Sequence, residues 1–256
     1  MPDSMRIHRA PRRARIAGML LAATLFGAVA AQAEEGHGMR AAQANVHDTA
    51  SLQRGARLYF NYCSGCHSLK YMSYSRIAED LQLGNDEVLH NFAFTGARIG
   101  DQVLANMPGE GAQQWFGKAP PDLSLEARAK GPDWIYNYLQ SFYVDPSSKV
   151  GWNNTVFPNA SMPNPLWELQ GVQKAVHAPA AAGAEAGVEK LELAHPGTQS
   201  PEQFAATARD ITAFLQYASE PAALQRSAVG VWVILYLALF TFLAFLLKHE
   251  FWKDVH

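Results

Sequence analysis

Apolar residues recur at helical spacing in two segments of the first 150 residues. The first segment runs from Ser51 to about Tyr62, and its apolar face consists of Leu52, Ala56, Tyr59 and Phe60. The second begins at Pro132 or Asp133 and ends at Phe142, with an apolar face of Trp134, Ile135, Tyr138 and Leu139. Because residues three and four positions apart share a helix face, both segments are predicted to be amphipathic helices.

A third amphipathic helix is predicted from residue 200 to residue 218. Its start combines an N-cap serine, a proline at the first helical position and a capping-box glutamine, which are Ser200, Pro201 and Gln203. Its apolar face consists of Phe204, Ala208, Ile211, Leu215 and Ala218. We expect this helix to pack on the 51–62 helix and to end before Pro221. Gly55 either allows a close approach of the two backbones or is a tolerated weak helix residue.

The segment from Val172 to Val188 is rich in alanine and glycine. It is predicted to be a surface excursion without chemistry, between the segments 166–176 and 188–193, which could pair as a short hairpin. The rest of the central region is predicted to be rich in loops. About 190 residues lie between residue 33 and the apolar run that begins at Ala228, which is enough for one well-buried domain.

The run from Ala228 to Leu247 contains no charged residue. About 20 apolar residues match the hydrocarbon thickness of a bilayer, so this run is predicted to be a transmembrane helix. A buried helix of a soluble core is the alternative, and the length of the run argues against it. Lys248, His249 and Lys253 follow in a short tail. The positive-inside rule predicts that this tail lies in the cytoplasm.

A shorter apolar run, Ile16 to Ala30, follows five arginines near the N-terminus and closes with Ala31-Gln32-Ala33. This pattern predicts a secretory signal peptide cleaved after Ala33, with a short membrane anchor as the alternative. The predicted organisation is a signal peptide over residues 1–33, an exported domain over 34–221, an anchor helix over 222–249 and a cytoplasmic tail over 250–256.

Removal of residues 1–33 makes the chain more acidic. The whole sequence has 21 Lys and Arg against 23 Asp and Glu. The part after residue 33 has 16 against 22, a net charge of −6. An acidic exported domain favours a basic soluble partner and argues against nucleic acid, although the same charge could serve solubility alone.

Cys63-Ser64-Gly65-Cys66-His67 is the pattern that attaches a c-type haem. Two thiols on a tight turn can bond to one porphyrin, and the following histidine can bind the iron. A thioredoxin-like redox pair or half of a zinc site are the alternatives. These two cysteines are the only ones in the sequence, and neither alternative calls for the histidine. We therefore predict one covalent haem.

The sixth ligand of the iron decides between electron transfer and ligand chemistry, because His/Met ligation fills both axial positions and raises the potential. The candidates are Met72, Met107, Met162, His90, His177 and His195. Met72 is five residues from His67, too near in sequence to reach the opposite haem face. Spacing does not choose between Met107 and Met162, both of which precede a proline.

Several motifs in order resemble the cytochrome c1 family, the haem subunit of ubiquinol:cytochrome c reductase, over residues 48–253. They are Arg54-Gly55, the run Tyr62 to Leu69 around the haem motif, Tyr71, Tyr74-Ser75-Arg76, Ala119 to Ser124, and Phe157 to Pro163, followed by a helix into a C-terminal anchor. The resemblance implies a mainly α fold: a cytochrome c-like helical haem domain with long loops and a short hairpin, plus one C-terminal transmembrane helix.

The resemblance also implies a ligand set. Cys63 and Cys66 would hold the haem, and His67 and Met162 would bind its iron. Pro121 would pack near the ring, and a basic residue beyond it would meet a propionate. Arg128 and Lys130 are the candidates for that contact, with solvated surface charge as the alternative. Lys130 stands where many relatives have arginine and lacks the planar fork of a guanidinium.

By the same resemblance, the chain would relay electrons from the Rieske iron-sulfur protein to cytochrome c, within a membrane complex that contains cytochrome b and is dimeric. The signal pattern places the haem domain in a bacterial periplasm and the anchor in the inner membrane. The sequence shows no paired catalytic carboxylates or nucleophile constellation, so we expect an electron-transfer subunit without a turnover site of its own. A membrane-tethered cytochrome serving a terminal oxidase and a haem peroxidase are the alternative functions.

Overall fold

A computed structural model describes residues 38–178 and 187–253 of the chain. The predicted signal peptide, the centre of the alanine-rich excursion and the last three residues of the tail lie outside the described residues. Residues 40–253 belong to one compact unit. Their helices are α2 (Thr49–Tyr62), α3 (Tyr74–Asp80), α4 (Asn85–Phe92), α5 (Gly109–Phe116), α6 (Glu126–Lys130), α7 (Pro132–Gln140), α8 (Trp167–Gln170), α9 (Pro201–Ser219) and α10 (Ala223–Phe251).

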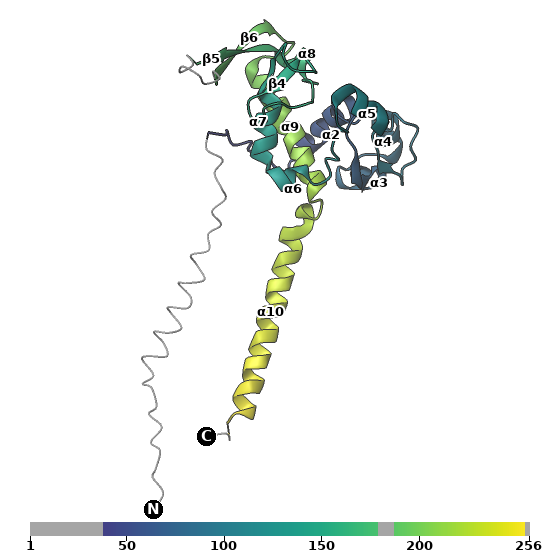
Figure 1. The fold of residues 1–256 in the computed structure, drawn as a ribbon. Helices are drawn as coiled ribbons and strands as arrows, with labels where there is room; N and C mark the ends of the chain where they lie inside the picture. Colours follow the sequence, from purple (N-terminus) through teal and green to yellow (C-terminus); the bar gives the residue numbers. More distant parts are fainter. Residues whose placement is uncertain (1–37, 179–186, 254–256) are drawn as a thin grey trace, which may run out of the picture. The chain divides into compact units, whose positions relative to one another are not determined.

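The core forms where α2 packs on α9 (Figure 1). All four predicted apolar residues of α2 and all five of α9 are buried. The helix starts follow local capping chemistry: the Asp48 side chain accepts from Ser51 N, and Ser200 and Gln203 form the predicted capping box. The mainly helical fold expected from the sequence is therefore confirmed.

Gly55 sits at the crossing of these two helices. A Cβ atom built on it would lie 2.8 Å from the Phe214 Cβ and closer still to the Asp210 carbonyl oxygen. The close-approach interpretation of Gly55 is thus correct. Around it, the Asp210 carboxylate accepts from Ser51 Oγ at 2.6 Å and from the Arg54 guanidinium at 2.6 and 2.9 Å. This network ties the first turns of α2 to the middle of α9.

Two sheets complete the fold, the first antiparallel and the second mixed. Strands β1 (Leu69–Ser73) and β2 (Gln102–Val103) form a two-stranded sheet next to the haem motif in sequence. The second sheet has the order β4-β3-β5-β6, built from β3 (Phe142–Val144), β4 (Trp152–Asn154), β5 (Gly171–His177) and β6 (Val188–Pro196). Pairing is antiparallel except between β3 and β5, which run parallel.

The structure corrects two predicted boundaries. The 132–142 helix ends at Gln140, because Phe142 starts β3 and pairs with Asn154. The predicted hairpin exists as β5 and β6, but its first strand begins at Gly171 rather than at Leu166. Residues 167–170 instead form α8, and Gly171 then takes a positive φ of 93°. A positive φ suits glycine and ends the helical turn before the strand.

Helix α10 contains the predicted apolar run and begins two residues after Pro221. It is 29 residues long, and none of its side chains is buried against the rest of the described chain. At 1.5 Å per residue it measures about 44 Å. That exceeds the roughly 30 Å hydrocarbon core of a bilayer, so its length and composition suit a transmembrane helix.

Candidate functional site

The Cys-x-x-Cys-His motif forms a tight turn at the C-terminal end of α2. Cys63 caps the helix, with its backbone N–H donating to Tyr59 O. The backbone N–H groups of Cys66 and His67 both donate to Cys63 O, at 3.0 and 2.9 Å. The two cysteines and the histidine of the predicted haem motif therefore share one backbone turn directly after the helix.

The His67 side chain is buried and held in one tautomer. Its Nδ1 atom lies 2.8 Å from the carbonyl oxygen of Pro121. Because a carbonyl oxygen can only accept, Nδ1 carries the hydrogen and the lone pair sits on Nε2. Burial lowers the pKa of His67, which favours the neutral imidazole. The arrangement prepares Nε2 to bind a metal ion.

The segment 121–124 lies beside the chain that follows His67. Leu123 N donates to Ser68 O at 2.9 Å, Lys70 N to the Asp122 carboxylate at 2.9 Å, and Tyr71 N to Ser124 Oγ at 3.2 Å. These bonds place the Pro121 carbonyl against the imidazole. The Pro121 side chain itself is exposed, and its predicted packing on the haem ring stays a prediction.

Burial raises the pKa of both thiols, which favours the protonated form. Burial, followed by the nearby Cys66, raises the pKa of Cys63 to about 12, and burial also raises that of Cys66. A disulfide-exchange or zinc-binding cysteine needs the thiolate, which a lowered pKa would favour. Within residues 38–178 and 187–253, no three His, Cys, Asp or Glu side chains converge as a metal site would require. The raised thiol pKa values therefore do not favour the thioredoxin-like alternative.

Met162 lies in the loop between β4 and α8, and its sulfur is in contact with α7. The Tyr138 hydroxyl donates a hydrogen bond to Met162 Sδ at 3.5 Å. Burial raises the pKa of Tyr138 to about 12, so the hydroxyl keeps its hydrogen at neutral pH. A thioether sulfur has two lone pairs, and this contact uses one of them. The other is free to bind a metal ion.

Two buried asparagines, missed in the sequence, shape the loop that carries Met162. The Asn154 amide donates to Tyr138 O at 2.8 Å, while its oxygen accepts from Val156 N and Phe157 N at 2.9 and 3.1 Å. The Asn153 oxygen accepts from Asn159 N at 2.8 Å, where the backbone takes a φ of 61°. The paired Asn-Asn ahead of a proline-containing loop was the available signal, because Asn side chains commonly bond to nearby backbone.

The other predicted ligand candidates are placed differently. Met72 is 1% exposed on β1, inside the hydrophobic core, where it packs rather than ligates. His90 on α4, His177 on β5 and His195 on β6 are exposed. Met107 is half-buried, and two residues before it Ala105 N donates to Ser68 Oγ at 2.8 Å. This bond keeps the Met107 segment near the haem motif, so Met107 remains the competing thioether.

The basic candidates for a propionate contact, Arg128 and Lys130, are both exposed on α6. Lys130 Nζ lies 5.5 Å from the centroid of the Trp134 ring, within cation–π range. Trp134 stacks on Tyr138 with centroids 4.8 Å apart and meets Phe157 edge-on at 6.3 Å. Lys130 is therefore part of the aromatic surroundings of Met162, whereas its predicted propionate contact stays a prediction.

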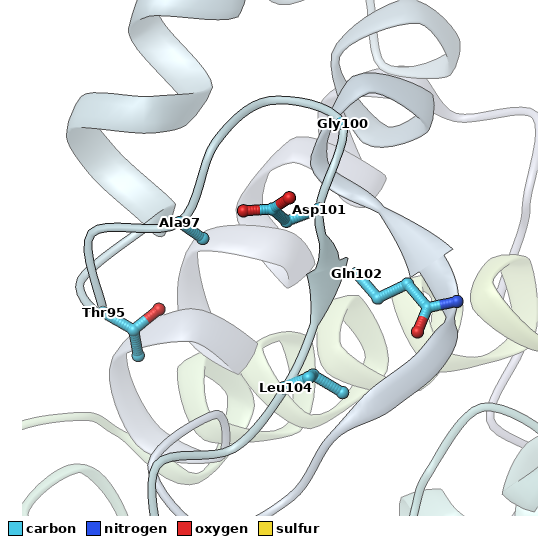
Figure 2. Close-up of a pocket in the computed structure, with 6 residues that line it drawn as sticks. All are labelled: Thr95, Ala97, Gly100, Asp101, Gln102 and Leu104. Atoms are coloured by element: carbon cyan, nitrogen blue, oxygen red, sulfur yellow. The ribbon is translucent and has the colours of Figure 1, made fainter.

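A separate pocket of about 520 Å³ lies in the 95–104 loop (Figure 2). Its lining residues are Thr95, Ala97, Gly100, Asp101, Gln102 and Leu104. The only charged group among them, Asp101, accepts from Arg98 N at 2.8 Å and so stabilises its own loop. The pocket contains none of the predicted site residues, and we assign it no chemistry.

The residues present fit a c-type haem. Two adjacent thiols lie on the turn that carries an imidazole with its Nε2 lone pair free, and an oriented thioether lies on a loop fixed by buried amides. An imidazole nitrogen and a thioether sulfur are the donor types found in electron-transfer haems. The chemistry supported by the arrangement is outer-sphere electron transfer.

Known proteins resemble this chain over most of its length. A model of the Cytochrome C1 family matches residues 40–255. A cytochrome c1 from Allochromatium vinosum is 44% identical over 93% of this chain and 99% of that protein. An ammonia monooxygenase gamma subunit from Nitrosomonas europaea is 38% identical over 82% of this chain and 85% of that protein. A cytochrome b/c1 from Bradyrhizobium diazoefficiens is 25% identical over 82% of this chain and 34% of that protein.

Proposed function

The chain belongs to the cytochrome c1 family, and on this premise we propose how its residues carry out electron transfer. Family membership makes it a membrane-anchored haem subunit of the cytochrome bc complex with one covalently bound c-type haem. Its finer role, by our proposal, is to take single electrons from the Rieske iron-sulfur protein and to pass them to a cytochrome c. When bound, the haem supplies a one-electron Fe(III)/Fe(II) couple.

The attachment and ligation are proposed as follows. The Cys63 and Cys66 sulfurs would hold the porphyrin through thioether bonds. His67 Nε2 would bind the iron, and the Pro121 carbonyl holds the imidazole ring through Nδ1–H. Met162 Sδ would supply the sixth ligand. The Tyr138 contact, which aims this sulfur, is the observation that favours Met162 over Met107.

The surroundings support a relay rather than a reaction site. With both His67 and Met162 bound, the iron would have no site for oxygen or peroxide, and the residues would need only to keep the two ligands in place between redox states. Arg128 or Lys130 would offset the charge of a propionate. The acidic mature domain would attract a basic cytochrome c, and this steering would weaken with salt.

The membrane arrangement follows from α10 and its flanks. We propose that α10 packs beside cytochrome b, that the haem domain lies in the periplasm and that the basic tail lies in the cytoplasm. The cytochrome b/c1 relative, in whose name the two cytochromes are joined, supports the partnership with cytochrome b. A dimeric complex is inferred from the family alone.

The deciding experiment is purification of the tagged chain from membranes in mild detergent, followed by an assay of ubiquinol-dependent cytochrome c reduction with a quinol-site inhibitor as control. Inhibitor-sensitive activity together with cytochrome b and an iron-sulfur subunit is expected. Copurification with an oxidase, or with a monooxygenase as the gamma-subunit relative suggests, would replace the proposal. Carbon monoxide binding to the native reduced protein would instead favour a haem enzyme.

Ligation is tested separately with a matched pair of variants. We expect Met162→Leu to remove the charge-transfer absorption of a thioether bound to ferric iron and to lower the haem potential. Met107→Leu should change neither. The reverse result would assign the sixth ligand to Met107 and leave the relay function intact.

A further inference from the structure

We propose that Tyr138 is a positioning residue for the sixth ligand and that its hydroxyl raises the potential of the haem. The proposal rests on the proposed ligation by Met162. Its starting observation is the hydrogen bond from the Tyr138 hydroxyl to Met162 Sδ at 3.5 Å. Tyr138 is half-buried. A thioether is a weak acceptor, so a tyrosine whose hydroxyl donates to sulfur is unusual.

The tyrosine ring is fixed on several sides, which gives the hydroxyl one direction. Trp134 stacks on the ring with a 10° angle between planes, and Phe142 meets it edge-on with centroids 4.9 Å apart. Trp134 lies one turn earlier on α7, and Phe142 begins β3. A ring held by both a helix and a sheet cannot easily turn its hydroxyl away from the sulfur.

The loop that carries Met162 is fixed to the same residue through its backbone. The Asn154 amide donates to Tyr138 O at 2.8 Å, and its oxygen accepts two backbone N–H groups at residues 156 and 157. Asn154 is completely buried. Tyr138 therefore contacts the loop twice, once by its carbonyl through Asn154 and once by its hydroxyl at the sulfur. Asn154 thus fixes the start of this loop, at residues 156 and 157, to the helix that carries the donor.

The direction of the effect on the potential follows from the dipole of the hydroxyl. Its positive end points at the sulfur, which would be bonded to the iron. Reduction removes one positive charge from the iron, so a positive dipole beside the ligand stabilises the reduced state relative to the oxidised one. Loss of the hydroxyl should lower the potential while the thioether stays bound.

The test is Tyr138→Phe in the full-length protein, purified as the membrane complex and titrated spectroscopically. At an ambient potential equal to the wild-type midpoint, the reduced-to-oxidised ratio of the variant should fall by about threefold, as expected for loss of one weak hydrogen bond. The thioether band should persist, and carbon monoxide should displace the sulfur more readily from the reduced variant. Tyr136→Phe is the matched control, because Tyr136 lies on the same helix but its ring faces the Arg40 guanidinium.

An unchanged ratio in Tyr138→Phe would overturn the proposal, and so would a loss of thermal stability without a change in ratio, which indicates packing alone. If the phenylalanine variant fails to fold, Tyr138→Leu gives the same readout. Met162→Leu distinguishes failure of the proposed ligation from failure of the proposed role of Tyr138. If that variant keeps the thioether band, the proposed ligation fails; if it loses the band while Tyr138→Phe matches wild type, only the role of Tyr138 fails.

Discussion

Replacing Gly55 with alanine would test the helix crossing that positions the haem motif. The added Cβ atom would lie 2.8 Å from Phe214 Cβ and nearer still to the Asp210 carbonyl. Both neighbours are rigid, because one is backbone and the other is the first side-chain carbon of a fully buried residue. The two helices must therefore move apart by roughly 1–1.5 Å to reach ordinary van der Waals contact.

The expected cost combines three terms. Overpacking of a tight contact costs about 1–3 kcal/mol. Separation of the helices also strains the hydrogen bonds of Asp210 to Ser51 and Arg54, and loss of a bond to a charged group costs about 1.5–3 kcal/mol. The higher helix propensity of alanine offsets this loss of unfolding free energy by about 1 kcal/mol. The net loss in unfolding free energy should be about 1.5–5 kcal/mol, which shifts Tm by roughly 3–20 °C for a domain of this size.

Thermal unfolding of the haem-loaded protein in detergent, followed by circular dichroism, measures this loss. Gly100→Ala is the matched control, because a Cβ atom there meets nothing within 4 Å and the backbone φ is not positive. The control should lie within about 0.5 kcal/mol of wild type, as exposed substitutions do. A Gly55→Ala protein that unfolds less than about 2 °C below wild type would refute the reasoning about the crossing.

Three further outcomes are expected. Asn154→Ala removes three hydrogen bonds from a fully buried amide. The variant should lose about 2–4 kcal/mol of unfolding free energy and should let carbon monoxide displace Met162. An unchanged denaturation midpoint would contradict this expectation. Tyr217→Phe removes the 2.8 Å bond to the Asp80 carboxylate and should cost about 1.5–3 kcal/mol in urea titration. A variant as stable as wild type would show that the bond contributes nothing. The second-order rate of reduction of a basic cytochrome c, measured by stopped flow, should fall as salt rises from about 0.01 to 0.15 M. Over this range the Debye length shrinks from about 30 to 8 Å. A rate independent of salt would exclude steering by the acidic domain.

The helices could be predicted because their signals are local. Apolar spacing identified the buried faces of α2 and α9, and the capping box fixed the start of α9. A predicted helix boundary was wrong where a contact with a distant segment determined the conformation. Phe142 continues the apolar face of α7, yet its pairing with Asn154 makes it the first residue of a strand. Periodicity alone cannot separate these two outcomes for a short apolar run.

The candidate site was predictable to the same extent. Cys63, Cys66 and His67 are adjacent in sequence, so the chemistry of the motif fixes their relation whatever the fold. The Pro121 carbonyl contacts His67 across 54 sequence positions. Because every residue has a backbone carbonyl, the identity of residue 121 does not reveal this contact. Its role could be recognised only after folding. The sequence pointed to Pro121 through its family motif, but to its ring rather than to its carbonyl.

The two sides of the proposed iron site are stabilised by different means, and this difference explains why one side was harder to predict. The His67 side lies on a turn that closes on α2 within five residues, so its geometry is set locally. The Met162 side is a loop that takes its shape from the amides of Asn153 and Asn154 and from Tyr138 on a separate helix. Side-chain bonds to backbone over such separations form only when the fold has brought the parts together. The thioether side is therefore where tertiary structure, more than the motif, would control ligand strength and haem potential.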